Sequence, residues 1–499
     1  MSSRKSDILL PLVAGGPRPW VVTLRSNILL PVLVVLMWPL GRLVEWSPYV
    51  NDYFSHVVLM VGISVTLAVS LQLINGVAGQ FSLGHAGFMA VGAYMAGYAT
   101  KTYAPDFAAA PQTADAAMVA AFFLALLVVM TTGGGLLTVI FVAVRRTRRV
   151  HRALPGVLAV VLAAWFVHDI SAARGQAELP WYLLWPQILA RLGDVFEWIM
   201  GMAAKAAPAV NSIVPACMKS GTTLLAALLG GGIMAAAAGL IVGLPTLRLR
   251  GDYLAIATLG FAEIIRVAVV NSEALGKATG LSVPPYSIEP NPEEGMAGQR
   301  IFPWIYGWML ITIVVVWRLA NSAKGRALQA VREDETAAAA TGIDATHHKV
   351  LAFVVGAFFA GIAGGLYAHL DGYLNPNSFG IMKSIELVVM VTLGGLGSIS
   401  GAILAAAVLT WLPELLRAPA DWAALLLRPF GVRGAEDLHM PQWLVDALAA
   451  VGENRMVFYA LLLIVMMLLR PRGLLGGREL WPQRRTLHAR PPAATEDMA

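Results

Sequence analysis

The chain has 499 residues, of which 58% are hydrophobic and 13% charged, and its net charge is +6. Its mean hydropathy of +0.68 excludes an ordinary soluble domain and indicates a polytopic membrane protein. The single cysteine, Cys217, excludes an internal disulfide.

Apolar runs recur along the whole chain, and most approach the ~20 residues that a bilayer-spanning helix needs. We count about eleven, which lie at 28–40, 57–74, 86–99, 117–144, 153–168, 222–246, 253–270, 302–320, 350–368, 385–412 and 456–469. The first run follows basic residues and has no small-residue cleavage site, so we expect a retained span and not a removed signal peptide. The expected fold class is an all-α membrane protein with about ten to twelve transmembrane helices.

Charged residues are distributed unevenly between these runs. Basic residues are concentrated at 145–152, within 318–349 and near 470, whereas 271–300 and 418–454 carry an acidic excess. Because short Lys- and Arg-rich loops stay in the cytoplasm, we expect the basic segments and both termini inside and the acidic segments outside. A nucleic-acid-binding role for the basic loop is not expected in a membrane chain.

Composition divides the chain into five parts. They are an N-terminal group of spans (1–104), an insertion with two additional spans (105–221), a core (222–417) that contains the polar loop 318–349, an external loop (418–454), and a last span with a cytoplasmic tail (455–499). Within the insertion, apolar residues recur at helical spacing from Trp181 to Met200. This pattern predicts an amphipathic helix at the membrane surface or, equally well, a packed helix in an external loop.

Two glycine-rich stretches interrupt the apolar runs. NGVAGQFSLGH at 75–85 and LGGLGSIS at 393–400 both contain Gly-x-x-Gly-x-x-Ser and are followed by apolar helix. Each glycine lowers helix stability by up to ~1 kcal/mol, so both stretches are predicted helix breaks at membrane depth. Unwound backbone there must border protein or a water-filled cavity, as along a transport path. The alternative is that the glycines only permit close helix packing.

Ionisable side chains occur inside the apolar runs. Glu263 and Arg266 are three residues apart on one helical face, and Glu386 lies near the start of another run. An ionised group at the centre of a membrane helix costs about 2.5–3.5 kcal/mol, so such groups normally pair or face a cavity. We expect Glu263 and Arg266 to form an intramembrane charge pair with a structural role. His85 has no accompanying Cys or carboxylate motif, so we favour a hydrogen-bonded packing role over catalysis, with a pore-lining role as the alternative.

The residues of the polar loop 318–349 predict a short exposed helix that ends near Gly342. Its alanines, Ala337 to Ala340, give a thin face that a partner's groove can accept. An ordinary helical loop without a docking role is an equal alternative from composition alone.

Enzyme signatures are missing: the sequence has no phosphate-binding loop, no His-Glu-x-x-His, no paired-cysteine metal site and no Gly-x-Ser-x-Gly. We therefore expect no catalytic residue, metal or cofactor in this chain, and any ATP-driven activity requires a separate ATPase chain.

Five motifs in order resemble one known group. They are GQFSLGHAGFMAVGAYMAG at 79–97, LPTLRLRGDYLAIATLGFAEIIR at 244–266, GRALQAVREDETAAAATGIDATHHKVLAF at 325–353, LGGLGSISGAIL at 393–404 and LLRPRGLLG at 468–476. Together they resemble the M-type membrane permeases of bacterial branched-chain amino-acid ABC importers. The chain departs from the family at 277–286, KATGLSVPPY, where only Thr279-Gly280 of the usual Thr-Gly-Gly-Pro-x-Gly remains.

The resemblance implies an ABC importer permease in the bacterial inner membrane that works by alternating access. Its implied partners are a second related permease, two cytoplasmic ATPase subunits that bind ATP and Mg²⁺, and a periplasmic protein that delivers leucine, isoleucine or valine. The loop would dock on an ATPase as a coupling helix through Glu335, Ala337, Ala338 and Gly342. The residues expected along the substrate pathway are Gly79, Gln80, Ser82, Gly84, His85, Gly394, Gly397 and Ser400.

Three alternatives stay open at this stage. A permease for urea or short amides would share the same motifs. A secondary transporter would use Glu263 and Glu386 as ion-coupling carboxylates. A membrane-bound enzyme would act without ATP, with the basic loop at 145–152 binding lipid headgroups.

Overall fold

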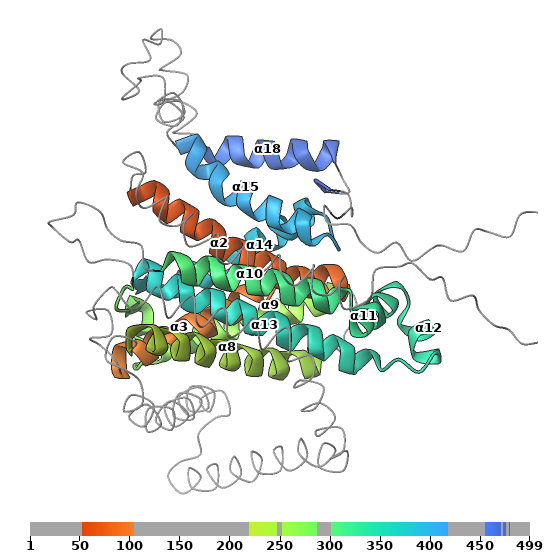
Figure 1. Ribbon diagram of the computed structural model, residues 1–499, viewed down its shortest axis with the longest axis horizontal. Coiled ribbons are helices and arrows are strands. Elements are labelled where there is room, and N and C mark those ends of the chain that lie inside the picture. Colours follow the sequence, from red (N-terminus) through yellow and green to blue (C-terminus); the bar gives the residue numbers. More distant parts are fainter. Residues whose placement is uncertain are drawn as a thin grey trace, which may run out of the picture.

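The computed structural model describes residues 52–103, 219–246, 252–286, 301–417, 455–470, 473–475 and Glu479. The expected spans at 28–40, 117–144 and 153–168 and the helix at 181–200 lie outside these residues, as do the basic loop at 145–152 and the external loop at 418–454. Within the described residues the chain is mostly helical (Figure 1).

The helices form a bundle with one small sheet. The helices are α2 (Asp52–Gln72), its π-helical continuation η1 (Leu73–Val77), α3 (His85–Tyr103), α8 (Lys219–Thr246), α9 (Asp252–Asn271), η5 (Lys277–Thr279), α10 (Phe302–Ala320), α11 (Ala323–Glu333), α12 (Glu335–Ala340), α13 (Ala345–Asp371), η6 (Pro376–Phe379), α14 (Ile381–Gly394), α15 (Ile399–Arg417) and α18 (Arg455–Leu469). Strands β1 (Leu281–Ser282) and β2 (Tyr373–Leu374) pair antiparallel, with Leu281 opposite Leu374.

Six helices among the described residues are long and apolar enough to cross a membrane. These candidate spans are Ser55–Val77, Thr223–Gly243, Tyr253–Asn271, Phe302–Ala320, Ala345–Asp371 and Ile399–Arg417. The expectation of an all-α, multi-pass membrane protein is confirmed. The apolar run at 385–412 is divided between α14 and α15, and α18 has 15 residues, fewer than a straight span needs.

The centre of the bundle is α13, which packs against α8, α3 and α2. Small residues allow these helices to approach closely: a Cβ on Gly92 of α3 would lie 2.1 Å from the carbonyl oxygen of Gly361 in α13. Glycine is therefore required at position 92 by the neighbouring backbone. Close packing through small residues is the usual way in which membrane helices associate, because lipid supplies no hydrophobic drive between them.

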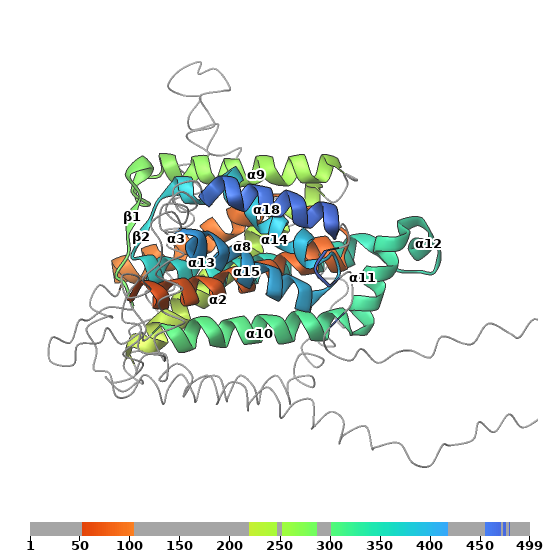
Figure 2. The same cartoon turned by 90° about the horizontal axis from the view of Figure 1, so that it is seen from above.

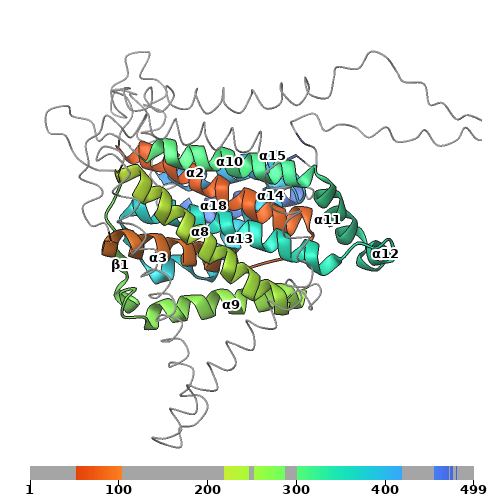
Figure 3. The ribbon, with the colours of Figure 1, turned by 60° about the horizontal axis from the view of Figure 1, so that its bottom comes forward.

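The bundle has two distinct ends. The short helices α11 and α12 project from one of them, which we call the loop end, and the β1–β2 sheet lies at the opposite end (Figure 2). The long helix α13 joins the two, since it begins soon after α12 and ends just before β2. Helices α9 and α10 lie along opposite edges of the bundle, with α13 and α8 between them (Figure 3).

The Gly92 contact gives a test of the packing. We expect Gly92→Ala to destabilise the protein by roughly 1–3 kcal/mol, because overpacking a tight contact forces backbone shifts. Gly260→Ala in α9 is the matched control, since nothing lies within 4 Å of a Cβ there. The measurement is the fraction that stays monodisperse in detergent after heating. Equal losses for both variants would contradict the assignment of a backbone contact at Gly92.

Candidate functional site at two helix breaks

The first glycine-rich stretch is a helix break, as predicted. Helix α2 continues as η1 to Val77, residues 78–84 are not helical, and α3 begins at His85. Gly79 has a φ of 66°, which favours glycine. The freed backbone finds partners nearby: the Gln80 amide donates to the Ile74 carbonyl at 2.9 Å, and the Ser82 amide donates to the Asn75 Oδ1 at 3.1 Å. The unwound segment is thus held by the turn that precedes it.

The second stretch is also a break. Helix α14 ends at Gly394 and α15 begins at Ile399. Between them Gly397 has a φ of 94°, where an L side chain would be strained. The backbone at Gly394 packs directly on Gly401, because a Cβ on Gly394 would lie 2.5 Å from the Gly401 carbonyl carbon. Both predicted breaks are therefore confirmed, and close packing accompanies them.

The two breaks contact each other, although the residues that bond across them are 323 and 326 positions apart. The Gln72 Nε2 donates to the carbonyl oxygens of Gly395 at 3.0 Å and Ser398 at 3.1 Å. A Cβ on Gly76 would lie 2.7 Å from the Gly397 amide nitrogen. We call residues 72–84 and 394–401 together the break junction. It joins the two halves of the chain at the loop end of the bundle.

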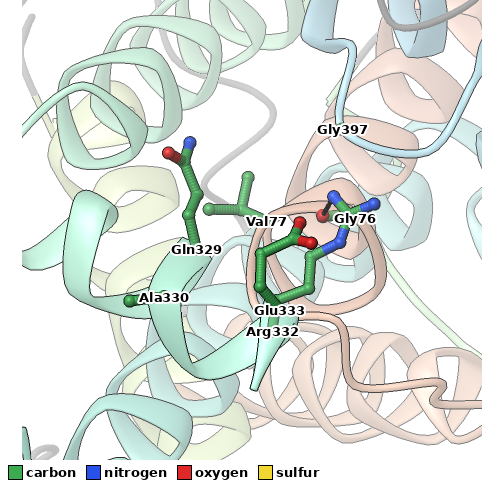
Figure 4. Close-up of a pocket in the computed structure, with 7 residues that line it drawn as sticks. All are labelled: Gly76, Val77, Gln329, Ala330, Arg332, Glu333 and Gly397. Atoms are coloured by element: carbon green, nitrogen blue, oxygen red, sulfur yellow. Dashed lines mark hydrogen bonds between the residues drawn. The ribbon is translucent and has the colours of Figure 1, made fainter. Parts of the chain in front are cut away.

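Helix α11 reaches the break junction through one side chain. The Arg332 Nη1 donates to the Gly76 carbonyl at 2.5 Å, and the guanidinium lies beside Gly397 (Figure 4). A positive group is favourable at the carbonyl end of a helix such as η1. A pocket of about 330 Å³ opens here, lined by Gly76, Val77, Gln329, Ala330, Arg332, Glu333 and Gly397. The sequence does not reveal Arg332 as a site residue, because its partner is 256 positions away.

A residue near the C-terminus closes the second break. The Glu479 carboxylate accepts from the Ile399 amide at 2.6 Å, and from the amide and the hydroxyl of Ser400 at 3.1 and 2.7 Å. The Leu474 amide donates to the Leu393 carbonyl at 2.7 Å. A carboxylate at a helix N-terminus satisfies free amides and interacts favourably with the helix dipole. Neither contact is visible in the sequence, since the tail resembles an ordinary charged terminus.

The side chains expected along the substrate pathway are mostly buried in the bundle. Gln80, Ser82, His85 and Ser400 are all buried. The His85 Nε2 lies 2.8 Å from the Ser70 hydroxyl, as suits a hydrogen-bonded packing histidine.

Gly84 packs against α9, where a Cβ would lie 2.5 Å from the Thr258 carbonyl oxygen. The structure thus brings the two stretches together at the break junction. Their assignment to a substrate pathway stays a prediction.

The polar loop forms two helices where the sequence suggested one. Asp334 ends α11 and caps α12, with its Oδ1 accepting from the amides of Thr336 at 2.8 Å and Ala337 at 3.0 Å. Gly342 follows α12 with a φ of 85°, as expected for a residue after a helix end.

The four expected docking residues do not share one surface. Ala337 and Gly342 are exposed, whereas Ala338 is buried. Glu335 forms an ion pair of 2.8 Å with Lys349, whose side chain is nearly buried in α13. Part of the expected docking set therefore fixes α12 to the bundle, and the outward surface of α12 is made of small residues.

The expected intramembrane pair is present, with the Arg266 Nε 2.7 Å from the Glu263 Oε2. A second pair, Lys383 with Glu386, is formed in α14 at 3.0 Å. In the part of the chain that the structure describes, no group of three His, Cys, Asp or Glu residues is suitable for holding a metal ion.

Comparison with known proteins agrees with the sequence motifs. The profile of the family described as "Branched-chain amino acid transport system / permease component" matches residues 53–170 and 195–467. The high-affinity branched-chain amino acid transport system permease protein LivM of Escherichia coli is 37% identical over 219 residues, covering 39% of this chain and 52% of that protein. Its counterpart in Salmonella typhimurium is 36% identical over the same length and shares of the two chains.

A third relative is named for a different cargo. The autoinducer 2 import system permease protein LsrC of Yersinia pseudotuberculosis is 35% identical over 127 residues, which are 23% of this chain and 36% of that protein. The chain spans about half the length of the LivM relatives. No solved structure matches it.

The tail contact at the second break is testable. We expect Glu479→Ala to lower stability by about 1 kcal/mol, because it removes the helix cap and the charge at the start of α15. Glu414→Ala is the matched control in the last turn of the same helix, where the carboxylate lies 3.9 Å from Arg417. Tryptophan fluorescence during heating in detergent measures both. If Glu414→Ala lowered stability as much as Glu479→Ala, the effect would come from the loss of any carboxylate near α15 and not from the loss of its cap.

Proposed function

The chain belongs to the family of permease components of branched-chain amino acid transport systems, and from this membership we propose that it is the membrane-spanning subunit of an ATP-driven importer of branched-chain amino acids. The observation that carries the proposal is the direct bond from α11, beside the exposed helix α12, to the break junction through Arg332 and Gly76. The LivM relatives are named for branched-chain amino acid transport, which supports the choice of cargo.

In this proposal the protein sits in the bacterial inner membrane with the loop end in the cytoplasm. Basic side chains at the loop end support that orientation, since Arg318, Lys324, Arg326 and Arg332 lie in or next to α11. The proposed partners are a second related permease, two cytoplasmic ATPase subunits that bind ATP and Mg²⁺, and a periplasmic amino-acid-binding protein. This chain carries out no covalent chemistry.

The mechanism follows from the contacts of α11 and α12. The small outward residues of α12 would rest against an ATPase subunit, and the Glu335–Lys349 ion pair would carry movement of α12 to α13. Arg332 would carry the same movement to the carbonyl end of η1 and to Gly397. Because unwound backbone bends more easily than helix, the break junction is the place where the bundle would change shape between outward- and inward-open states.

The alternatives are less well supported. A secondary transporter would leave the exposed helix α12 and the bond from α11 to the break junction without a role. Urea or short amides would require the same overall machinery, and the names of the LivM relatives favour amino acids over them.

The proposal is tested with the full complex in proteoliposomes. We expect leucine uptake that requires ATP, the ATPase subunits and the binding protein. Uptake without ATP, or failure of the chain to associate with the ATPase subunits, would refute the importer.

Arg332 gives a sharper test of coupling. Loss of a charge-assisted hydrogen bond, worth ~1.5–3 kcal/mol, is expected to reduce ATP-driven uptake about tenfold or more in Arg332→Gln, while ATPase association persists. Arg326→Gln is the matched control on the same helix, because Arg326 bonds to the Asn321 carbonyl at 3.3 Å and not to the break junction. Equal uptake by the two variants would remove Arg332 from the mechanism.

The docking surface of α12 is tested separately. Ala337 is exposed, so Ala337→Arg is expected to preserve the fold but prevent close contact with a partner's groove. Co-purification with the ATPase subunits should fall for this variant. Ala323→Arg, at an exposed position at the start of α11, is the control and should retain them. Normal association of Ala337→Arg would place the docking surface elsewhere.

A further inference from the structure

Two ion pairs, one on the candidate span α9 and one on the shorter helix α14, are not enclosed by the bundle. In α9 the side chains of Arg266 and Glu263 are 28% and 30% exposed. In α14 those of Lys383 and Glu386 are 28% and 39% exposed. Glu263 lies at the middle of a candidate membrane span, Tyr253–Asn271.

Charged groups at this depth do not face lipid, because hydrocarbon leaves them without polar partners. By comparison, the Lys349–Glu335 pair at the loop end has one nearly buried member, since Lys349 is 6% and Glu335 32% exposed. For the pair in α9, partial exposure of both members within a candidate span therefore indicates a surface that borders water or another protein.

The two pairs belong to adjoining elements. Arg266 Nη1 donates to the Asn377 Oδ1 at 3.4 Å, and Asn377 is exposed in η6. The short helix η6 contacts both α9 and α14, and these two helices also contact each other. We call this surface of α9, η6 and α14 the polar face.

Large apolar side chains accompany these charges. The exposed ones are Ile264 and Val267 on α9, and Ile381, Met382 and Ile385 on α14. Ion pairs with no net charge beside aliphatic side chains complement a ligand that has a positive group, a negative group and a branched hydrocarbon chain. Urea has neither full charges nor a hydrocarbon chain, so it would leave both features unused.

We propose that the polar face holds the transported amino acid during its passage, with Arg266 binding the α-carboxylate and Glu263 binding the α-ammonium. In an α-amino acid the ammonium and the carboxylate are attached to the same carbon atom. Both groups can therefore contact one ion pair at once, each beside the side chain of opposite charge. Asn377, beside Arg266, offers a further polar contact, and the neighbouring isoleucines receive the side chain. This inference rests on the proposed import of branched-chain amino acids.

The first experiment measures leucine uptake at saturating binding protein, so that delivery does not limit the rate. Arg266→Gln and Glu263→Gln are each expected to lower maximal uptake about tenfold, as expected for a lost charge-assisted hydrogen bond. ATP hydrolysis and association with the ATPase subunits should persist.

The control pair is Lys277 and Glu273, which lies outside the membrane span. The Lys277 ammonium, through its hydrogen bond and its charge, holds the pKa of the Glu273 carboxyl below its usual value, so this pair is also charged at neutral pH. Lys277→Gln should transport as the unmodified protein does.

A charge-swapped variant separates ligand binding from a structural role. Glu263→Arg combined with Arg266→Glu keeps an ion pair on α9 but reverses its order and puts a carboxylate beside Asn377. A structural role predicts that the swap restores uptake. The polar-face proposal predicts that the swapped protein folds but stays impaired, so full recovery would overturn it.

The second experiment measures access to water. In a Cys217→Ala background, Ile264→Cys and Ile385→Cys place single thiols on the polar face, and Ile233→Cys places one on α8, where the side chain is 61% exposed. A charged thiosulfonate should react about tenfold faster on the polar face, because the reactive thiolate forms in water and not in lipid. Equal rates would overturn the inference while leaving ATP-driven uptake intact. Absence of ATP-driven uptake in the unmodified protein would instead refute the proposed function.

Discussion

Backbone hydrogen bonding inside the membrane is the constraint on which this structure depends. Each helix break frees amides and carbonyls inside the bundle, and each freed group that is buried needs a partner from the protein. Gln72 and Asn75 supply side-chain partners from the first break itself. Arg332 and Glu479 supply others from the polar loop and the tail. The need for partners therefore draws distant parts of the chain to one place.

This convergence explains why a polar loop can affect the membrane core. Arg332 leaves α11 and ends on the carbonyl of Gly76, so α11 cannot move far without breaking a bond in the break junction. On the same side, Glu335 joins α12 to α13, the central helix of the bundle. The loop end is thus connected to the core by two charged contacts, each reaching a different helix.

The sequence predicts features that depend on local pattern. The two breaks follow from glycine spacing, and the Glu263–Arg266 pair follows from a separation of three residues on a helix. Partners across hundreds of positions, such as Gln72 with Gly395, leave no local signal. The inward orientation of Ala338 was likewise hidden, because Asp334 divides the loop into two helices and four successive alanines do not indicate which one packs inside.

The amides at the start of α15 and the carboxylate that caps them are made at different times during synthesis. Since domains form as the chain emerges from the ribosome, α2, η1 and α3 are available early, whereas Glu479 is made after the whole of α15. About eighty positions separate Ile399 from its cap. The amides of Ile399 and Ser400 are therefore synthesised well before the carboxylate that they bond in the folded protein.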